Sequence, residues 1–286
     1  MRRKRGSGLL PFPHCLNCRG GLKILFAPPE CPAYAFWKNQ TRPTVDIQEA
    51  HQNWTELGND DPMWAILTDP DKKGGKWTAE EFFQNGREEI RRAMKKLEDS
   101  GIALQPGRAL DFGCGLGRLS QALACYFAWV DGVDISASMI EKARAFNRAP
   151  EKVRYHLNLK ADLSAFPSAT YDFIYTRICL QHIPPQYQLR YISEFMRLLK
   201  PGGVADFQTI HSHGLRALVP NWFTEIYRKW KHRGKPFIAM YGVSPRRVLE
   251  AIPAGGAVAK RHERSPYEGW ERRFGNDYFV AVKQTA

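Results

Sequence analysis

A glycine-rich turn between an apolar run and a helical pattern is the segment of this chain with the clearest chemistry. Residues 108–118 read RALDFGCGLGR, in which apolar residues surround Asp111 and glycine stands at positions 113, 115 and 117. Glycine lacks the Cβ that blocks close approach, so such a turn brings backbone N–H groups up to a ligand. The spacing departs from the G-x-G-x-x-G of dinucleotide-binding turns. The predicted ligand is therefore a nucleoside without a diphosphate.

Two further acidic residues fit a nucleoside site. Asp134 ends the apolar run WVDGVDIS, 21 residues after Gly113, and the acid that ends the second strand of such a site accepts hydrogen bonds from ribose hydroxyls. The alternative role for Asp134 is to cap the next helix. Asp162 follows the third predicted strand, VRYHLN, and is predicted to accept a hydrogen bond from an adenine amino group; the alternative is an ordinary surface acid.

The same features resemble a known family when taken in order. DFGCGLGR, GVDIS, the strand YDFIYT and LKPGG have the order and spacing of class I (seven-strand) S-adenosylmethionine-dependent methyltransferases, over residues 78–286. The resemblance implies an α/β fold with a doubly wound, mostly parallel seven-stranded sheet, an antiparallel C-terminal hairpin and an added N-terminal helical layer. It also implies S-adenosyl-L-methionine as the cofactor.

The resemblance assigns roles around the cofactor. The turn is expected to wrap the methionine part, through Asp111, Gly113, Cys114, Gly115 and Gly117. The alternative is a tight turn with no ligand, but three near-consecutive glycines carry an entropic cost that a plain loop avoids. The adenosine part is assigned to the residues Asp134, Ile135, Met139, Asp162 and Leu163. Of these, Leu163 offers a backbone N–H, and Met139 packs either on the purine or in the core.

The reacting end is predicted to lie after the strand YDFIYT, because ligands of open α/β sheets bind outside the carboxyl ends of the strands. Arg177 is counted with the cofactor-binding residues there. His182 is the candidate general base, since an imidazole with an ordinary pKa is neutral near pH 7 and can take a proton. The alternative is that His182 caps the helix predicted from Pro184. Methyl transfer from a sulfonium depends chiefly on alignment and desolvation, and needs a base only when the acceptor must lose a proton.

The chain divides into three predicted parts. Residues 1–43 form a basic, cysteine-containing irregular tail, and residues 44–104 form a helical lid layer with a capping box that begins at Thr78. Within this layer, the first helix is expected to end at Gly58, and the helix that follows the capping box is expected to kink at Gly86. Residues 105–286 form a Rossmann-like methyltransferase domain with a lid insertion at 211–243. Strands are predicted at 107–112, 129–134, 153–158, 171–177 and 204–210, followed by a terminal hairpin.

Composition bounds the partners. The net charge of +13 is concentrated in residues 2–5 and 216–273, which fits a solvated face, an anionic small molecule or RNA. The longest apolar run, residues 122–130, is too short for a membrane span, and a cytoplasmic protein is predicted. Cys15, Cys18 and Cys31 resemble half of a zinc ribbon, but a structural zinc needs four ligands, so no metal is predicted.

The leading prediction is an S-adenosylmethionine-dependent methyltransferase that acts on a small-molecule acceptor, with O-methylation favoured over N- or C-methylation and an anionic acceptor as one option. No N/D-P-P-[YF] motif follows the fourth strand, which argues against nucleic-acid amino methylation. Two alternatives remain open. One is an rRNA or tRNA methyltransferase with a zinc-like N-terminal module, and the other is a cofactor-binding protein without activity.

Overall fold

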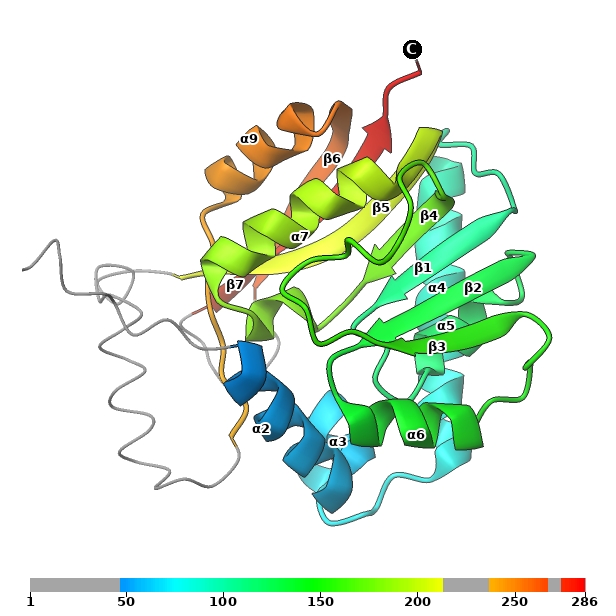
Figure 1. Ribbon diagram of the computed structural model, residues 1–286, viewed down its shortest axis with the longest axis vertical. Helices are drawn as coiled ribbons and strands as arrows, with labels where there is room; N and C mark the ends of the chain where they lie inside the picture. The colour runs from blue at the N-terminus through cyan, green and yellow to red at the C-terminus, as the bar shows by residue number, and fades with distance from the viewer. Residues whose placement is uncertain (1–46, 213–236, 267–273, 286) are drawn as a thin grey trace, which may run out of the picture. The chain divides into compact units, whose positions relative to one another are not determined.

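Seven strands form one mixed sheet in the order β3-β2-β1-β4-β5-β7-β6 (Figure 1). The strands are β1 Arg108–Phe112, β2 Trp129–Asp134, β3 Val153–Leu157, β4 Tyr171–Thr176, β5 Leu199–Ser212, β6 Ala257–Pro266 and β7 Phe274–Lys283. Strands β1 to β5 pair parallel, and β7 lies antiparallel to both β5 and β6. The predicted fold class, with its antiparallel C-terminal hairpin, is confirmed.

The computed structural model describes residues 47–212, 237–266 and 274–285, all in a unit that spans Val45–Ala286. The predicted irregular tail, with Cys15, Cys18 and Cys31, lies outside the described residues. So do residues 213–236 of the predicted lid insertion. Within the described part of the chain, no helix is both long and apolar enough to cross a membrane.

Helices cover both faces of the sheet because the central strands are apolar on both sides. The helices are α2 Ile47–Asp60, α3 Pro62–Ile66, α4 Ala79–Asp99, α5 Arg118–Leu123, α6 Ala137–Ala145, α7 Pro185–Leu198 and α9 Pro245–Ala254, with short 3-10 turns at η2 Pro70–Lys72 and η3 Leu180–His182. In Figure 1, α7 and α9 lie in front of the sheet, and α4 and α5 lie behind it. Each face has its own buried apolar cluster.

The N-terminal helical layer depends on two glycines that permit close packing. Helix α2 runs through Gly58, where a Cβ would lie 2.4 Å from Ser138 Oγ of α6. Helix α4 is continuous through Gly86, where a Cβ would lie 2.5 Å from the carbonyl oxygen of Arg118. The expectations that Gly58 ends one helix and Gly86 kinks another were therefore wrong. The capping box that begins α4 at Thr78 is confirmed.

Strand β5 is longer than predicted, since it begins at Leu199 and ends at Ser212. The strand was predicted at 204–210, after the sequence Lys-Pro-Gly-Gly. That sequence lies within the strand instead, at a register shift between Tyr171 and Phe173 of the neighbouring β4. A Cβ on Gly203 would lie 2.9 Å from the carbonyl oxygen of Tyr171, so glycine permits this close approach.

Candidate functional site

The glycine turn between β1 and α5 is held against the end of β2. Gly113, Gly115 and Gly117 have φ values of 75°, 52° and 81°, a region that side chains rarely adopt. The N–H groups of Gly113 and Cys114 donate to the Val133 carbonyl at 2.8 and 3.1 Å. Because these two N–H groups hold the turn in place, they are already used as hydrogen-bond donors. The glycines instead contribute a backbone conformation that other residues rarely adopt and leave space where a side chain would lie.

Asp134, at the end of β2, completes this anchoring. Its Oδ2 accepts the N–H of Gly115 at 2.8 Å, and its Oδ1 accepts the N–H of Ser136 at 2.8 Å. Ser136, not Asp134, is the N-cap of α6, because its side chain accepts the N–H of Met139. Burial raises the pKa of Asp134, while the backbone donors of Ser136 and Gly115 oppose that rise. Each carboxylate oxygen keeps a second lone pair for a ligand.

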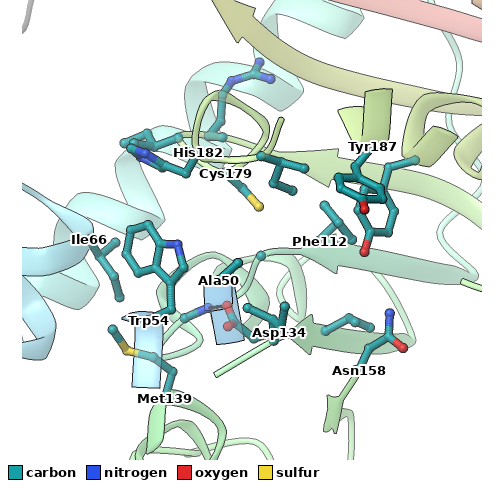
Figure 2. A pocket seen from close by; sticks show the side chains of 18 of the residues that line it. Ala50, Trp54, Ile66, Phe112, Asp134, Met139, Asn158, Cys179, His182 and Tyr187 are labelled. Carbon is teal, nitrogen blue, oxygen red and sulfur yellow. Dashed lines mark hydrogen bonds between the residues drawn. The ribbon is translucent and has the colours of Figure 1, made fainter. Parts of the chain in front are cut away.

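A pocket opens at the carboxyl ends of β1, β2 and β4 (Figure 2). Its wall is mainly apolar and aromatic, and its polar side chains include Asp134, Asn158, Arg177 and His182. Trp54, from α2, and Met139, from α6, lie on the side of the pocket opposite Tyr187 in Figure 2. The other lining residues are Ala50, Ala65, Ile66, Phe112, Gly113, Gly115, Val133, Ile135, Ile178, Cys179, Ile183, Pro184 and Tyr191. This composition suits a ligand that has one polar edge and a flat apolar body.

The predicted site residues divide into two groups. Those that line the pocket are Gly113, Gly115, Asp134, Ile135, Met139, Arg177 and His182. Those that do not are Asp111, Cys114, Gly117, Asp162 and Leu163. Their roles toward a cofactor stay predictions for both groups.

Asp162 lies outside the pocket wall. Its carboxylate pairs with Arg190 at 2.8 Å and accepts the N–H of Ser164 at 3.1 Å. Asn158, at the end of β3, lines the pocket in its place, and the Nδ2 of Asn158 donates to the backbone carbonyl of Asp162 at 2.8 Å. The segment after β3 therefore reaches the pocket, but through a residue four positions earlier than predicted.

Asp111 is fully buried within β1, one residue before the strand ends. The Ser120 hydroxyl donates to its Oδ2 at 2.6 Å, and its Oδ1 has no hydrogen-bond partner among the described residues. Burial raises the pKa of Asp111 to about 7, against the opposing effect of the Ser120 bond. The carboxyl lies beneath the turn as an unsatisfied acceptor.

His182 is held in the neutral state. Its Nδ1 lies 2.6 Å from the Ala239 carbonyl, its Nε2 lies 3.1 Å from Gln181 Nε2, and its ring meets Trp54 edge-on at 5.1 Å. Burial lowers the pKa of His182 to about 4, and the bond to Ala239 opposes this only in part. Helix α7 has Pro184 at its N-cap, with no capping side chain, so His182 does not cap it.

Arg177 lies at the edge of the pocket, after β4. Its Nη2 donates to Asp206 Oδ1 at 2.7 Å, and the guanidinium lies over the rings of Tyr175 at 4.5 Å and Tyr278 at 5.3 Å. The side chain is only 12% exposed. Because an ion pair and two aromatic faces fix it, Arg177 is a rigid cationic wall.

Helix α2 covers the pocket through contacts that sequence reasoning missed. Asn53 makes two bonds of 2.9 Å to the backbone of Phe237, through Nδ2 to the carbonyl and Oδ1 from the N–H. Ser138 Oγ donates to the Thr55 carbonyl at 2.8 Å. These bonds place Trp54 in the wall. The sequence signal for this role of Trp54 was an aromatic residue in an amphipathic helix. Such a residue is equally typical of an ordinary core position.

Comparison with known proteins gives a family match and a similar curated protein. Residues 109–203 match a family model described as a methyltransferase domain. A ubiquinone biosynthesis O-methyltransferase of Xanthomonas campestris pv. campestris (strain B100) is 30% identical over 142 residues, which cover 48% of this chain and 59% of that protein. This chain therefore spans about three fifths of the length of that curated relative.

Two solved structures share the fold. The magnesium protoporphyrin IX methyltransferase of Synechocystis PCC 6803, with bound S-adenosylhomocysteine, aligns with a TM-score of 0.55 at 18% identity and covers 84% of this chain and all of its own. The cyclase SpnF aligns with a TM-score of 0.60 at 15% identity, over 85% of this chain and 99% of its own. At these identities the likeness concerns the fold alone.

Proposed function

We propose that this chain, which belongs to the class I, seven-strand S-adenosylmethionine-dependent methyltransferases, transfers a methyl group from S-adenosylmethionine to a hydroxyl oxygen of a small-molecule acceptor. The family model over residues 109–203 and the relative named as an O-methyltransferase support this reaction. One observation carries the proposal. The glycine turn is bonded to Asp134, and together they form one wall of a mainly apolar pocket at the carboxyl ends of the strands.

The residues present fit S-adenosylmethionine. The turn at Gly113 and Gly115 faces the pocket next to Asp134, whose remaining lone pairs suit the ribose hydroxyls. Ile135 and Met139 supply apolar surface for the base. Asp111 lies two residues before the same turn, and its buried Oδ1 has no partner in the described ranges, so a positive charge nearby is favourable. When bound, the cofactor supplies a methyl group that its sulfonium already activates.

The chain's own residues would contribute alignment and the exclusion of water. Trp54 and the aromatic wall limit solvent access, which strengthens every electrostatic interaction inside the pocket. We retain His182 as a residue that contacts the reacting region, but its pKa of about 4 makes it a weak base. Its role is better described as positioning, with a neutral ring fixed between Trp54 and Gln181.

An anionic acceptor is part of the proposal. The chain carries 42 Lys and Arg against 29 Asp and Glu, and Arg177 presents a fixed guanidinium at the edge of the pocket. A carboxylate or phosphate on the acceptor would meet this positive surface with favourable long-range attraction. The same charge also suits RNA, which is why the test includes an RNA pool.

The test is transfer of a labelled methyl group from S-adenosylmethionine to a small-molecule extract and, separately, to total RNA. Calorimetric titration with S-adenosylhomocysteine runs in parallel. Label in a small molecule at an ether position supports the proposal. Label in RNA favours the RNA methyltransferase instead, and tight binding without any transfer favours a non-catalytic binding protein. A chain that binds neither form of the cofactor would refute the assignment.

A further inference from the structure

A second cleft lies next to the cofactor pocket, over the face of β5, β7 and β6 that α7 and α9 leave uncovered. Its walls come from α4 and from the segment around Ile66–Asp69, and its floor includes the strand residues Asp206, Gln208, Asn276 and Tyr278. Ile66, Arg177 and Ile178 line both cavities. The two cavities therefore share part of their walls, through Ile66 of α3 and the two residues that follow β4.

The strand register places two buried carboxylates in one row of the sheet. Asp111 of β1 is paired with Tyr175 of β4, and Tyr175 is paired with Asp206 of β5. Paired residues of parallel strands point to the same face, so both carboxylates flank Tyr175 on the α4 side. Asp206 thus lies at the level of the glycine turn and opens toward the cleft.

The two carboxylate oxygens of Asp206 differ in their hydrogen bonds. Its Oδ1 accepts from Arg177 Nη2 at 2.7 Å, whereas its Oδ2 has no partner among the described residues. The residue is only 1% exposed, and it lines the cleft. A buried acceptor without a donor destabilises the folded chain, so a ligand that donates a hydrogen bond to it would be bound more tightly.

Gln181 supplies a second bare acceptor in the same wall. Its Nε2 faces His182 Nε2 at 3.1 Å, and its Oε1 is buried with no partner among the described residues. Gln208, by contrast, is satisfied, because its Oε1 accepts the Ile178 N–H at 3.2 Å and its Nε2 donates to Asn276 at 2.7 Å. The cleft therefore presents two acceptors, beside Ile178, that need donors.

We propose that this cleft is the acceptor subsite and that it selects a molecule with hydroxyl groups, whose hydrogens are accepted by Asp206 Oδ2 and Gln181 Oε1. The inference rests on the proposed methyl transfer and names the substrate class and a catalytic residue for it. The acceptor oxygen forms the new O–C bond as the methyl–sulfur bond breaks, and the hydroxyl proton passes to Asp206 Oδ2. The products are a methyl ether and S-adenosylhomocysteine, and Asp206 then releases the proton to water.

His182 does not compete for this role. Its Nδ1 is bonded to the Ala239 carbonyl, and its Nε2 is the acceptor for Gln181. Both ring nitrogens are occupied, so His182 fixes the amide of Gln181 with its Oε1 directed away from the ring. Asp206 lines the cleft and is paired with Arg177, one of the residues that line both cavities, and no described residue uses the lone pairs of its Oδ2.

The charges of the cleft favour a hydroxyl over an ammonium donor. Its lining carries five cations, Arg92, Lys96, Arg177, Arg261 and Arg264, against four carboxylates, Asp69, Glu89, Asp206 and Glu263. Two of these carboxylates are already paired with cations of the cleft, Asp206 with Arg177 and Glu263 with Lys96. An ammonium group would gain little there, whereas a neutral hydroxyl meets no repulsion.

The test uses the full chain saturated with S-adenosylhomocysteine and three ring probes of similar size. Catechol offers two adjacent hydroxyl donors, 1,2-dimethoxybenzene offers none, and benzylamine offers an ammonium. Binding is measured by calorimetry, and the position of catechol is read from soaked crystals. We expect catechol to bind at least tenfold more tightly than either of the other probes, with its oxygens next to Asp206 and Gln181.

Three variants sharpen the test. In Asp206→Asn the amide oxygen stays on Arg177, so an N–H₂ donor replaces the bare acceptor, and Gln181→Leu removes the second acceptor. Each variant is expected to weaken catechol binding roughly tenfold or more. The matched control is Asp172→Asn, a buried carboxylate on β4 that pairs with Lys200 and lines neither cavity. It is expected to bind catechol as the unaltered chain does, and all three variants should keep their affinity for S-adenosylhomocysteine.

A kinetic readout separates catalysis from binding. With labelled cofactor and catechol, Asp206→Asn should lower kcat by more than it raises KM, whereas Gln181→Leu should act chiefly on KM. The inference would be overturned if catechol did not bind, bound elsewhere, or bound no more tightly than 1,2-dimethoxybenzene. It would also be overturned if benzylamine bound more tightly than catechol, or if Asp206→Asn kept full turnover. Failure of the unaltered chain to bind S-adenosylhomocysteine would instead remove the proposed function on which the inference rests.

Discussion

Asp131 and Asp206 are two buried carboxylates of one sheet with opposite surroundings. Asp131 is 0% exposed and Asp206 is 1% exposed. Both oxygens of Asp131 are used: Oδ2 accepts from Arg108 at 2.7 Å and from the Tyr171 hydroxyl at 3.0 Å, and Oδ1 pairs with His156 at 2.7 Å. Asp206 has Arg177 on one oxygen and, within the described part of the chain, no partner on the other.

The difference separates a structural group from one that is ready for a ligand. Burial opposes the charge of Asp131, but the bonds from His156 and Arg108 outweigh it and lower the pKa of Asp131 to about 2. No further group is needed to satisfy that carboxylate. Asp206 is the same residue type and is buried to a similar degree, yet one of its oxygens has no donor among the described residues. The count of bonds, not burial alone, distinguishes the two.

The largest expected effect is on stability, in Asp131→Asn. The change removes the charge that three partners share, and we expect the free energy of unfolding to fall by about 3 kcal/mol at pH 7, with affinity for S-adenosylhomocysteine retained. Urea unfolding measures the first quantity and calorimetry the second. A variant as stable as the unaltered chain would mean that the three bonds of Asp131 contribute nothing net.

The pH dependence of the free energy of unfolding of Asp131→Asn tests whether the pKa of Asp131 is lowered in the folded chain. A carboxylate whose folded pKa is about 2 stabilises the fold fully above its unfolded pKa near 3.8, and this contribution disappears as the pH falls through 2. The stability gap between Asp131→Asn and the unaltered chain should therefore be constant from pH 7 to 5 and narrow from pH 4 to 2. A gap that widens with acid would contradict the pairing.

His182 offers a further contrast with Asp131, because its bond to Ala239 does not outweigh the effect of burial on its pKa. Its folded pKa of about 4 lies below the usual 6.5, so its neutral burial stabilises the fold fully above pH 6.5, and this contribution is lost as the pH falls to 4. The unaltered chain should lose about 2–3 kcal/mol over that interval relative to His182→Gln, which does not titrate there. Urea unfolding at pH 7, 5.5 and 4.5 measures the difference. If the two chains lost stability equally as the pH falls, the His182 ring would be more exposed to solvent than proposed.

Sequence reasoning predicted the elements that local patterns specify. The turn at Gly113–Gly117, the capping box at Thr78 and the terminal hairpin follow from residues that are close together in the chain. Gly58 and Gly86 were misread as helix breakers, because their reason is a neighbour 80 or 32 residues away. A single sequence shows that glycine is present but not which backbone or side chain approaches it.

The site shows the same limit. Asp131 in WVDGVD and Asp206 in VADFQ both lie inside apolar strands, and neither segment shows which of the two carboxylates is fully bonded. Their difference lies in remote partners, Arg108 and His156 for one and Arg177 for the other. The family resemblance pointed to the segment after the third strand, but it assigned Asp162 where the pocket wall holds Asn158.

The variant Asp134→Ala tests the carboxylate that is proposed to bind the ribose of the cofactor. The variant loses the carboxylate that holds Gly115 in place and that is proposed to accept from the ribose, so affinity for S-adenosylhomocysteine should fall by roughly 1–3 kcal/mol. Asp134→Asn is the matched variant, since it keeps the shape and one acceptor and should lose less. Calorimetry with both variants measures the difference. Unchanged affinity in Asp134→Ala would remove Asp134 from the cofactor site.

The smallest expected effect is the stability change of Asp206→Asn, and it is the one on which the comparison depends most directly. Only the bond to Arg177 is at stake, and the amide oxygen of asparagine can still accept it, while the bare Oδ2 already costs the folded chain free energy. The free energy of unfolding should therefore change by no more than about 1 kcal/mol at pH 7, well below the loss in Asp131→Asn measured in the same urea experiment. A loss as large as that of Asp131→Asn would mean that Asp206 is held by the fold as firmly as Asp131. Its unused oxygen would then carry no information about a ligand.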